Sequence, residues 1–223
     1  MQKKLRTSFT VDKRDSLGTT PLMEAARQGT YDRLIKCLDE GSDINAVDYA
    51  GNNALMYAIE RKQDGIATIL LSKGIDAGRK NAVGQTPLLN ACMEGVPEII
   101  QRLLEHDIAL DVQDKHGNTG LMISCAIRDS WAACKLVDAG ADVDTLRNSK
   151  GATGLDVARE SLRGRDLELF LACVEKRREA KSAQDAVNAA KRQQEIEQNA
   201  HDATVARDNV ILLKPVAFRP KPQ

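Results

Sequence analysis

The chain has 223 residues, in which 32 Lys and Arg balance 32 Asp and Glu, so its formal net charge at neutral pH is zero. This balance excludes a global field that would draw the protein to nucleic acid or to an anionic membrane, and we expect neither as a partner. Because 42% of the residues are hydrophobic and only 3% are aromatic, we expect a core of aliphatic side chains in thin layers.

Residues 1–14 form a polar N-terminal arm that is rich in Lys and Arg. We expect this arm to cap the first layer of the fold, and a basic contact arm is the alternative. No apolar segment of the signal-peptide type follows it, and no stretch reaches the ~18 apolar residues of a membrane-spanning helix. We therefore expect a soluble, cytoplasmic protein without a standard export signal.

A stretch of about twelve residues recurs along the chain. The run GTTPLMEAARQG begins at Gly18, and related copies begin at Gly51, Gly84, Gly117 and Gly151. The intervals between these glycines are 33, 33, 33 and 34 residues. A constant period of this length is typical of stacked repeats.

Each copy contains the signals of two short helices. In the first copy Thr20 stands directly before Pro21, which predicts a helix start, because Thr caps the free N–H groups and Pro lacks only an N–H that a first turn does not use. Gly29 predicts the end of this helix. A second helix follows, with a buried face formed by Leu34, Ile35 and Leu38.

Three positions depart from the glycines that end these helices. Lys62 and Arg128 stand where the first copy has Gly29, and we expect a modest strain there because the left-handed conformation disfavours a side chain. Asp107 stands where the first copy has Gly41. We expect it to adopt the left-handed conformation, which Asp tolerates better than most residues.

This unit of two short antiparallel helices and a projecting D-x-x-G turn resembles the ankyrin repeat. TPLM at Thr20 and TPLL at Thr86 match all but the last position of the family's T-P-L-H motif, and GADVD at Gly140 resembles its G-A-D-V-N end. The resemblance implies an all-α ankyrin-repeat solenoid. In the family the His of T-P-L-H links neighbouring repeats, so we expect this stack to depend more on apolar contact. The residues at that position here are Met23, Met56, Leu89, Met122 and Asp156.

The expected ankyrin-repeat domain covers residues 15–173. Its repeats are about 15–47, 48–80, 81–113 and 114–147, followed by a degenerate copy at 148–173. The charged residues of that last copy are typical of the polar cap that a repeat array needs.

Two further segments follow the repeats. Residues 174–209 are charged and lack Gly and Pro, which favours a long helix. Its apolar seam is mostly Ala, so it is either a solvated helix or a weakly self-associating coiled coil. Residues 210–223 form a Pro-containing basic tail with Phe218. Such a tail can be disordered, bind a partner as an extended motif, or fold back onto the repeats.

No constellation of catalytic or metal-binding residues is visible. The histidines, His106, His116 and His201, share no ligand spacing, and the five cysteines include no C-x-x-C pair and favour a reducing compartment. We expect Cys92 and Cys125 to be small core residues, since the family places an Ala there. We expect no cofactor, no metal and no enzymatic activity, with a redox sensor as the alternative.

Trp131 is the only tryptophan, and it stands at a second-helix position that normally faces solvent. Packing under the C-terminal helix and a role as an exposed contact residue are both open.

The resemblance implies a protein-binding module whose concave surface is made by the first helices and the turns. By register, the exposed positions of this surface include Arg27, Gln28, Tyr49, Glu60, Arg61, Met93, Glu94, Lys115, His116 and Ile127. Charged residues of both signs lie in its first half, whereas Met93 and Ile127 make the second half apolar. We therefore expect a partner protein with a charged end and an apolar end.

Two alternatives accompany this function. In the first, the protein is an adaptor or secreted effector whose C-terminal helix and tail carry recognition. In the second, it is a regulatory subunit of an enzyme. We expect a monomer, with weak self-association through residues 174–209 as the other interpretation.

Overall fold

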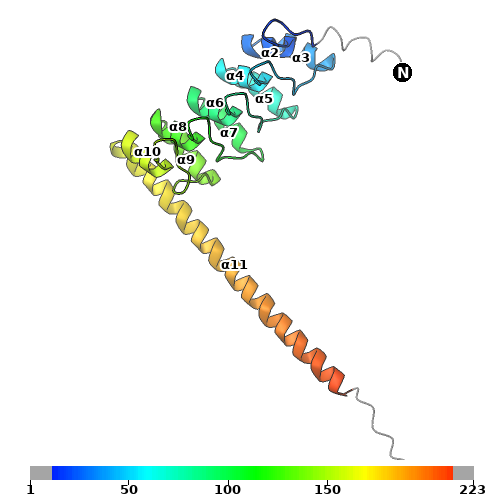
Figure 1. Ribbon diagram of the computed structural model, residues 1–223, viewed down its shortest axis with the longest axis vertical. Coiled ribbons are helices and arrows are strands. Elements are labelled where there is room, and N and C mark those ends of the chain that lie inside the picture. Colours follow the sequence, from blue (N-terminus) through cyan, green and yellow to red (C-terminus); the bar gives the residue numbers. More distant parts are fainter. Residues whose placement is uncertain (1–11, 213–223) are drawn as a thin grey trace, which may run out of the picture. The chain divides into compact units, whose positions relative to one another are not determined.

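The computed structural model describes residues 12–212, and for residues 199–212 it describes the backbone alone. Within this range the chain forms helices joined by turns and loops (Figure 1), and the predicted all-α solenoid is confirmed. The helices are α2 (Pro21–Gln28), α3 (Tyr31–Asp39), α4 (Ala54–Glu60), α5 (Asp64–Ser72), α6 (Pro87–Glu94), α7 (Pro97–Leu104), α8 (Gly120–Ala126), α9 (Ser130–Ala139), α10 (Gly154–Ser161) and α11 (Gly164–Leu212).

The chain divides after Arg177 into two compact units, and the repeats belong to the first. In Figure 1 the first helices of the pairs, α2, α4, α6, α8 and α10, follow one another along one side of the stack. The second helices, α3, α5, α7 and α9, form the layer behind them. α11 begins in the first unit and continues into the second, where the described side chains of residues 178–198 are exposed.

All five first helices begin with the same capping arrangement. The side-chain oxygen of the residue before each helix accepts the backbone N–H three residues further on, which satisfies one of the free donors of the first turn. Pro21 and Pro87 occupy the first helical position of α2 and α6, as predicted. The capping residues are Thr20, Asn53, Thr86, Thr119 and Thr153.

Small residues bring the two layers together. Ala25, Ala58 and Ala91 occupy one register of the first helices and are fully buried, so neighbouring helices approach closely. Leu70 and Leu103 occupy one register of the second helices and are also fully buried. The core is thus a thin aliphatic layer between the two rows of helices.

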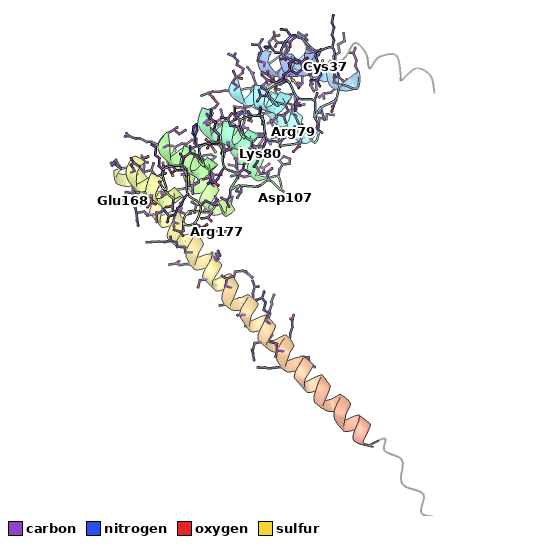
Figure 2. The ribbon with its side chains drawn as sticks, in the orientation of Figure 1. Cys37, Arg79, Lys80, Asp107, Glu168 and Arg177 are labelled. Atoms are coloured by element: carbon purple, nitrogen blue, oxygen red, sulfur yellow. The ribbon has the colours of Figure 1, made fainter. Side chains whose placement is uncertain are left out.

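Two residues of the second layer differ from the prediction. Ile35 was assigned to the buried face of its helix, but it lies at the edge of that face and is 37% exposed. Asp107 does not adopt the left-handed conformation: Gly41 N and Gly74 N donate to Leu38 O and Leu71 O, whereas the loop at Asp107 closes through a bond from Ile108 N to His106 O. Figure 2 shows Asp107 on the loop that follows α7.

The expected strain after the first helices is confirmed. Lys62 and Arg128 have φ values of 54° and 65°, close to the 71° of Gly29 and the 60° of Gly95 at the equivalent positions. A residue with a Cβ adopts this conformation at a cost of about 1 kcal/mol, so the turn geometry persists where its glycine is absent.

The first part of α11 packs on α9. Phe170 and Val174 are buried beneath the stack. Ser130 Oγ donates to Asp166 Oδ1 at 3.1 Å, and the thiol of Cys134 lies 3.8 Å from the carbonyl oxygen of Leu169. This end of the helix therefore covers the last layer of the stack, as a capping element does.

Each projecting turn is closed by an Asp or Asn side chain. The residue that opens the turn accepts, through its side-chain oxygen, the backbone N–H four residues further on, at 2.7 to 3.1 Å. This geometry explains the D-x-x-G pattern, since Asp and Asn favour such side-chain-closed turns. The opening residues are Asp15, Asp48, Asn81, Asp114 and Asn148.

Backbone hydrogen bonds join most of the turns to one another. Tyr49 N donates to Leu17 O at 3.1 Å, and Ala82 N donates to Ala50 O at 2.8 Å. At the far end of the stack Ser149 N donates to His116 O at 2.8 Å.

Side-chain bonds reinforce these connections. Asn81 Nδ2 donates to Asn52 Oδ1 at 2.9 Å, and Asn148 Nδ2 donates to Asn118 Oδ1 at 3.2 Å. On the loops below the turns, the Asn45 side chain accepts the N–H of Asp76 at 2.8 Å. The Asp111 side chain accepts the N–H of Asp142 in the same way, also at 2.8 Å.

These bonds are interrupted between α6 and α8. Among the described residues, no hydrogen bond links the turn before α6 to the turn before α8. The sequence explains two of the missing bonds: Gly78 has no side chain where Asn45 has its acceptor, and the Asp114 carboxylate cannot donate where Asn81 does. Helix packing continues across this place, from α6 to α8 and from α7 to α9. We call it the α6/α8 junction, and its hydrogen-bonded neighbour the α4/α6 junction.

Candidate binding surface

Two adjoining hollows lie along the face formed by the first helices and the turns. The acidic hollow, between α4 and α6, has a volume of about 360 Å³ and contains Glu60 and Glu94. The apolar hollow, between α6, α8 and α10, has a volume of about 600 Å³ and contains Ile123, Ile127 and Val157. Met93 lines both, so the two hollows form one continuous groove.

The acidic hollow gathers negative charge from several sources. Glu60 and Glu94 are the last residues of α4 and α6, where the helix ends add partial negative charge. Tyr57 donates its hydroxyl to the carboxylate of Asp48 at 2.7 Å, and Asp48 is only 7% exposed. Burial, and then this hydrogen bond, raise the pKa of Tyr57, so the phenol remains a neutral donor.

Two cations lie beside this hollow but do not line it. Arg61 Nη2 lies 3.7 Å from Glu60 Oε1, with about half of each side chain exposed. Lys62 Nζ donates to the backbone carbonyl of Glu94 at 2.8 Å rather than to its carboxylate. Since an exposed ion pair contributes little, about 0 to 1 kcal/mol, the two glutamates are available to a partner.

The apolar hollow has an aliphatic floor and a polar rim. Met93 and Ile127 are each 47% exposed and line the same hollow, and exposed apolar side chains that adjoin in one patch are typical of a binding surface. Lys150 and Glu160 stand on the rim with opposite charges, and the bonded pair of Asn118 and Asn148 lines its side. A desolvated apolar centre inside a polar rim is the usual anatomy of a protein-binding surface.

Five of the ten residues predicted for this surface line one or both of the hollows. Glu60, Met93 and Glu94 line the acidic hollow, and Met93, His116 and Ile127 line the apolar hollow. The other five lie outside both: Arg27, Gln28, Tyr49, Arg61 and Lys115.

The residues outside the hollows have identifiable surroundings. Arg27 forms an ion pair with Glu24 at 2.7 Å, and Gln28 donates to the same carboxylate. The Tyr49 ring lies against Gly18 and is 74% exposed. They lie apart from the side chains that the structure brings together in the hollows.

Several groove residues were not predicted from the sequence, although their regular spacing along the repeats could have identified them. Tyr57, Asn90, Ile123 and Val157 recur at intervals of 33, 33 and 34 residues, and all four line a hollow. Glu160 stands at the same register as Met93. Both Val157 and Glu160 lie in the degenerate last copy, which was assigned to the cap.

The buried thiols oppose the redox interpretation. Cys92 and Cys125 are fully buried, as predicted for core residues, and burial raises the pKa of each to about 12. The pKa of Cys134 is also raised to about 12, first by burial and then by the neighbouring thiol of Cys173. A redox sensor requires an accessible thiolate of low pKa, which none of these three provides.

Trp131 stays 39% exposed on α9, and the ammonium group of Lys135 lies 5.8 Å from its ring centre. This contact is of the cation–π type and covers one face of the ring.

Two further searches concern the described residues. Among the side chains that the structure describes, those of residues 12–198, no cluster of three or more His, Cys, Asp or Glu is placed to hold a metal ion. No helix in residues 12–212 combines the length and the apolar character needed to cross a bilayer.

The family model for ankyrin repeats in three copies matches residues 3–81 and 76–147. The chain therefore belongs to the ankyrin-repeat family. Ankyrin repeats are interaction domains without catalytic residues of their own, so this part of the chain is a protein–protein interaction module.

The chain is similar to parts of several larger proteins. It is 36% identical to palmitoyltransferase ZDHHC13 of Mus musculus over 147 residues, which are 65% of this chain and 24% of that protein. It is 30% identical to potassium channel AKT2/3 of Arabidopsis thaliana over 155 residues, 70% of this chain and 19% of the channel. With neurogenic locus notch homolog protein 1 of Xenopus tropicalis, the identity is 34% over 145 residues, 65% of this chain and 6% of that protein.

The chain thus spans about a quarter or less of the length of these relatives. Their names refer to a transferase, a channel and a notch homologue, and the common element is the repeat region.

Proposed function

We propose that this protein is a non-enzymatic binding module whose partner protein lies in the groove formed by the acidic and apolar hollows. The repeat domain of residues 15–173 presents the groove as a concave surface. The observation that carries this proposal is the continuity of the two hollows through Met93, with large apolar side chains left exposed at that point.

The fold supports binding by a preformed surface. The groove side chains stand on short helices whose opposite faces are fully buried, and the turns beside them are closed by hydrogen bonds. A surface held in this way changes little on binding, so less ordering entropy opposes association.

A variant pair tests the proposal. Met93→Asp and Ile127→Asp place a charge in the groove, and each should reduce partner retention by about tenfold or more, the effect expected of a central contact. Ile35→Asp on α3 is the matched control, because Ile35 is exposed and lies in the other layer. The full-length proteins are cross-linked in a lysate, and the captured proteins are compared by quantitative mass spectrometry after circular dichroism has shown equal folding.

The same experiment includes a chain without the tail of residues 210–223, of which 213–223 lie outside the described residues. Partners that are lost from both groove variants but retained by Ile35→Asp and by the shortened chain support the proposal. Partners that survive both groove variants and disappear with the tail would assign recognition to the C-terminal segment, as expected for an adaptor or effector.

A further inference from the structure

The chemistry of the groove differs between its two ends. The inference drawn from this difference rests on the proposed function. One end is the acidic hollow and the other is the apolar hollow. The sequence pattern alone leaves the sign of the partner's charge open, because Arg27 and Arg61 alternate with Glu60 and Glu94 at the exposed positions. In the structure Arg27 and Arg61 lie outside both hollows.

The acidic hollow is suited to a cation. Among its lining residues the charged ones are Glu60 and Glu94, and no Lys or Arg lines it. The Asp48 carboxylate lies behind Tyr57, and the ends of α4 and α6 add to the negative potential. The bond from Lys62 Nζ to the Glu94 carbonyl shows that this helix end already accepts an ammonium group.

The apolar hollow is suited to a large uncharged side chain. Its floor is formed by Met93, Ile123, Ile127 and Val157, whereas its charged residues, Asp114, Lys150 and Glu160, belong to the turns and to the end of α10. The Asp114 carboxylate already accepts the backbone N–H groups of His116 and Asn118. Burial of an apolar side chain here would remove the exposed parts of Met93 and Ile127 from water. A charged side chain would lose its hydration without a partner at the floor.

The distance between the two hollows sets the spacing of the partner's side chains. The acidic hollow lies between α4 and α6, and the apolar hollow lies around α8, about one and a half helix spacings further along. Since neighbouring first helices pack about 8–10 Å apart, the two centres are about 12–15 Å apart. An extended chain rises about 3.3 Å per residue. Two side chains about four residues apart would therefore span this distance, and both point to the groove because side chains of an extended chain alternate between its two faces.

We propose that the groove binds an extended protein segment in which a Lys or Arg side chain enters the acidic hollow and a large aliphatic or aromatic side chain, about four residues away, enters the apolar hollow. The carboxylates select the cation, and the apolar floor contributes most of the binding free energy, as buried apolar anchors do at other interfaces.

A peptide selection tests both the site and its chemistry. Random peptides displayed on phage are selected on the full-length chain, and the enriched sequences are synthesised and measured by fluorescence anisotropy. Enriched peptides should share a basic residue and a large apolar residue about four positions apart. Glu60→Lys/Glu94→Lys should weaken them about tenfold or more, and replacement of the peptide's basic residue by Glu should restore binding to this variant.

The matched control is Asp39→Lys/Glu105→Lys. It introduces the same charge change at the ends of α3 and α7, outside both hollows, and should alter affinity by no more than about twofold. Equal melting temperatures of the two double variants establish that folding is not the cause of any loss.

The outcomes separate this inference from the proposed function. Peptides that Ile127→Asp displaces, but that show no basic residue or bind Glu60→Lys/Glu94→Lys unchanged, overturn the charge assignment and leave the groove as the binding site. Peptides that bind every groove variant equally, or a selection with no enrichment, oppose both.

Discussion

The α4/α6 and α6/α8 junctions contain the same helix packing but differ in what joins their turns. At the α4/α6 junction the turns are linked through Ala82 and Ala50 and through Asn81 and Asn52. At the α6/α8 junction such bonds are absent among the described residues, while α6 still packs on α8. The difference shows that a repeat stack can keep a continuous core while its surface bonds are interrupted by one or two residues.

The groove changes its chemistry at the same place. The acidic hollow lies over the α4/α6 junction, and the apolar hollow begins at Met93 and extends over α8 and α10. The charged end of the groove therefore lies over the hydrogen-bonded α4/α6 junction. The apolar end begins at the α6/α8 junction and extends over the turns before α8 and α10, which are hydrogen-bonded to each other.

The largest effect should come from the core that both junctions share. Leu70→Ala and Leu103→Ala remove equivalent, fully buried side chains, and each should lower the free energy of unfolding by about 2–5 kcal/mol. Urea unfolding followed by circular dichroism measures both. If Leu103→Ala cost much less than Leu70→Ala, the α6/α8 junction would have a looser core, and the contrast would extend beyond its turns.

A smaller effect should appear in cysteine labelling, which reports local opening. The thiol of Cys92 lies 3.2 Å from the position that a Cβ on Gly120 of α8 would occupy, so it faces the α6/α8 junction. Cys125 has the same register on α8, beside α10. If fewer bonds make opening easier by about 1.4 kcal/mol, Cys92 should be labelled about tenfold faster. Mass spectrometry of the alkylated peptides measures both rates, and equal rates would contradict the prediction.

The pH dependence of this labelling has a definite sign. Burial raises the pKa of both thiols to about 12, so at neutral pH alkylation requires opening, after which the pKa returns to about 8.5. Labelling should rise about tenfold per pH unit up to that value and then level off. Because the folded pKa is the higher one, the thiols stabilise the fold fully below about pH 8.5 and lose this contribution as the pH rises toward 12.

The smallest effect should be an increase in the free energy of unfolding. Gly78→Asn supplies the acceptor that Asn45 and Asp111 provide elsewhere, and a Cβ at Gly78 meets only Asp76 Oδ1, at 3.6 Å. A new bond to the N–H of Ala109 should add about 0.5–1.5 kcal/mol to the free energy of unfolding. Gly78→Ala is the control, because it adds only the backbone contribution of about 0.4–1 kcal/mol. Equal stability of the two variants would show that the bond does not form.

The repetitive features of the fold could be predicted because they depend on local rules. The period, the Thr caps and the left-handed Lys62 and Arg128 all follow from residues a few positions apart. The prediction for Asp107 was wrong because its loop closes through a bond between its two neighbours, from Ile108 N to His106 O, which replaces the left-handed turn of the other copies. The prediction that Ile35 is buried was wrong because helical periodicity does not define the width of the buried stripe.

The groove was only partly predictable for a different reason. Register identified Glu60, Met93, Glu94 and Ile127, but it also included Arg61, which differs from Glu60 by one position and lies outside the hollow. Side-chain direction decides between such neighbours. Likewise, Gly78 is an unremarkable loop residue until the structure shows that its equivalents accept hydrogen bonds from the next repeat.

The interrupted bonds at the α6/α8 junction have a mechanical consequence. A segment that occupied both hollows would lie across this junction and connect its two sides from outside, as a brace does. Binding would then stiffen the stack where it has the fewest bonds of its own, and the free energy of association would appear as resistance to local opening. The bound partner would therefore stabilise the same repeat stack that holds it.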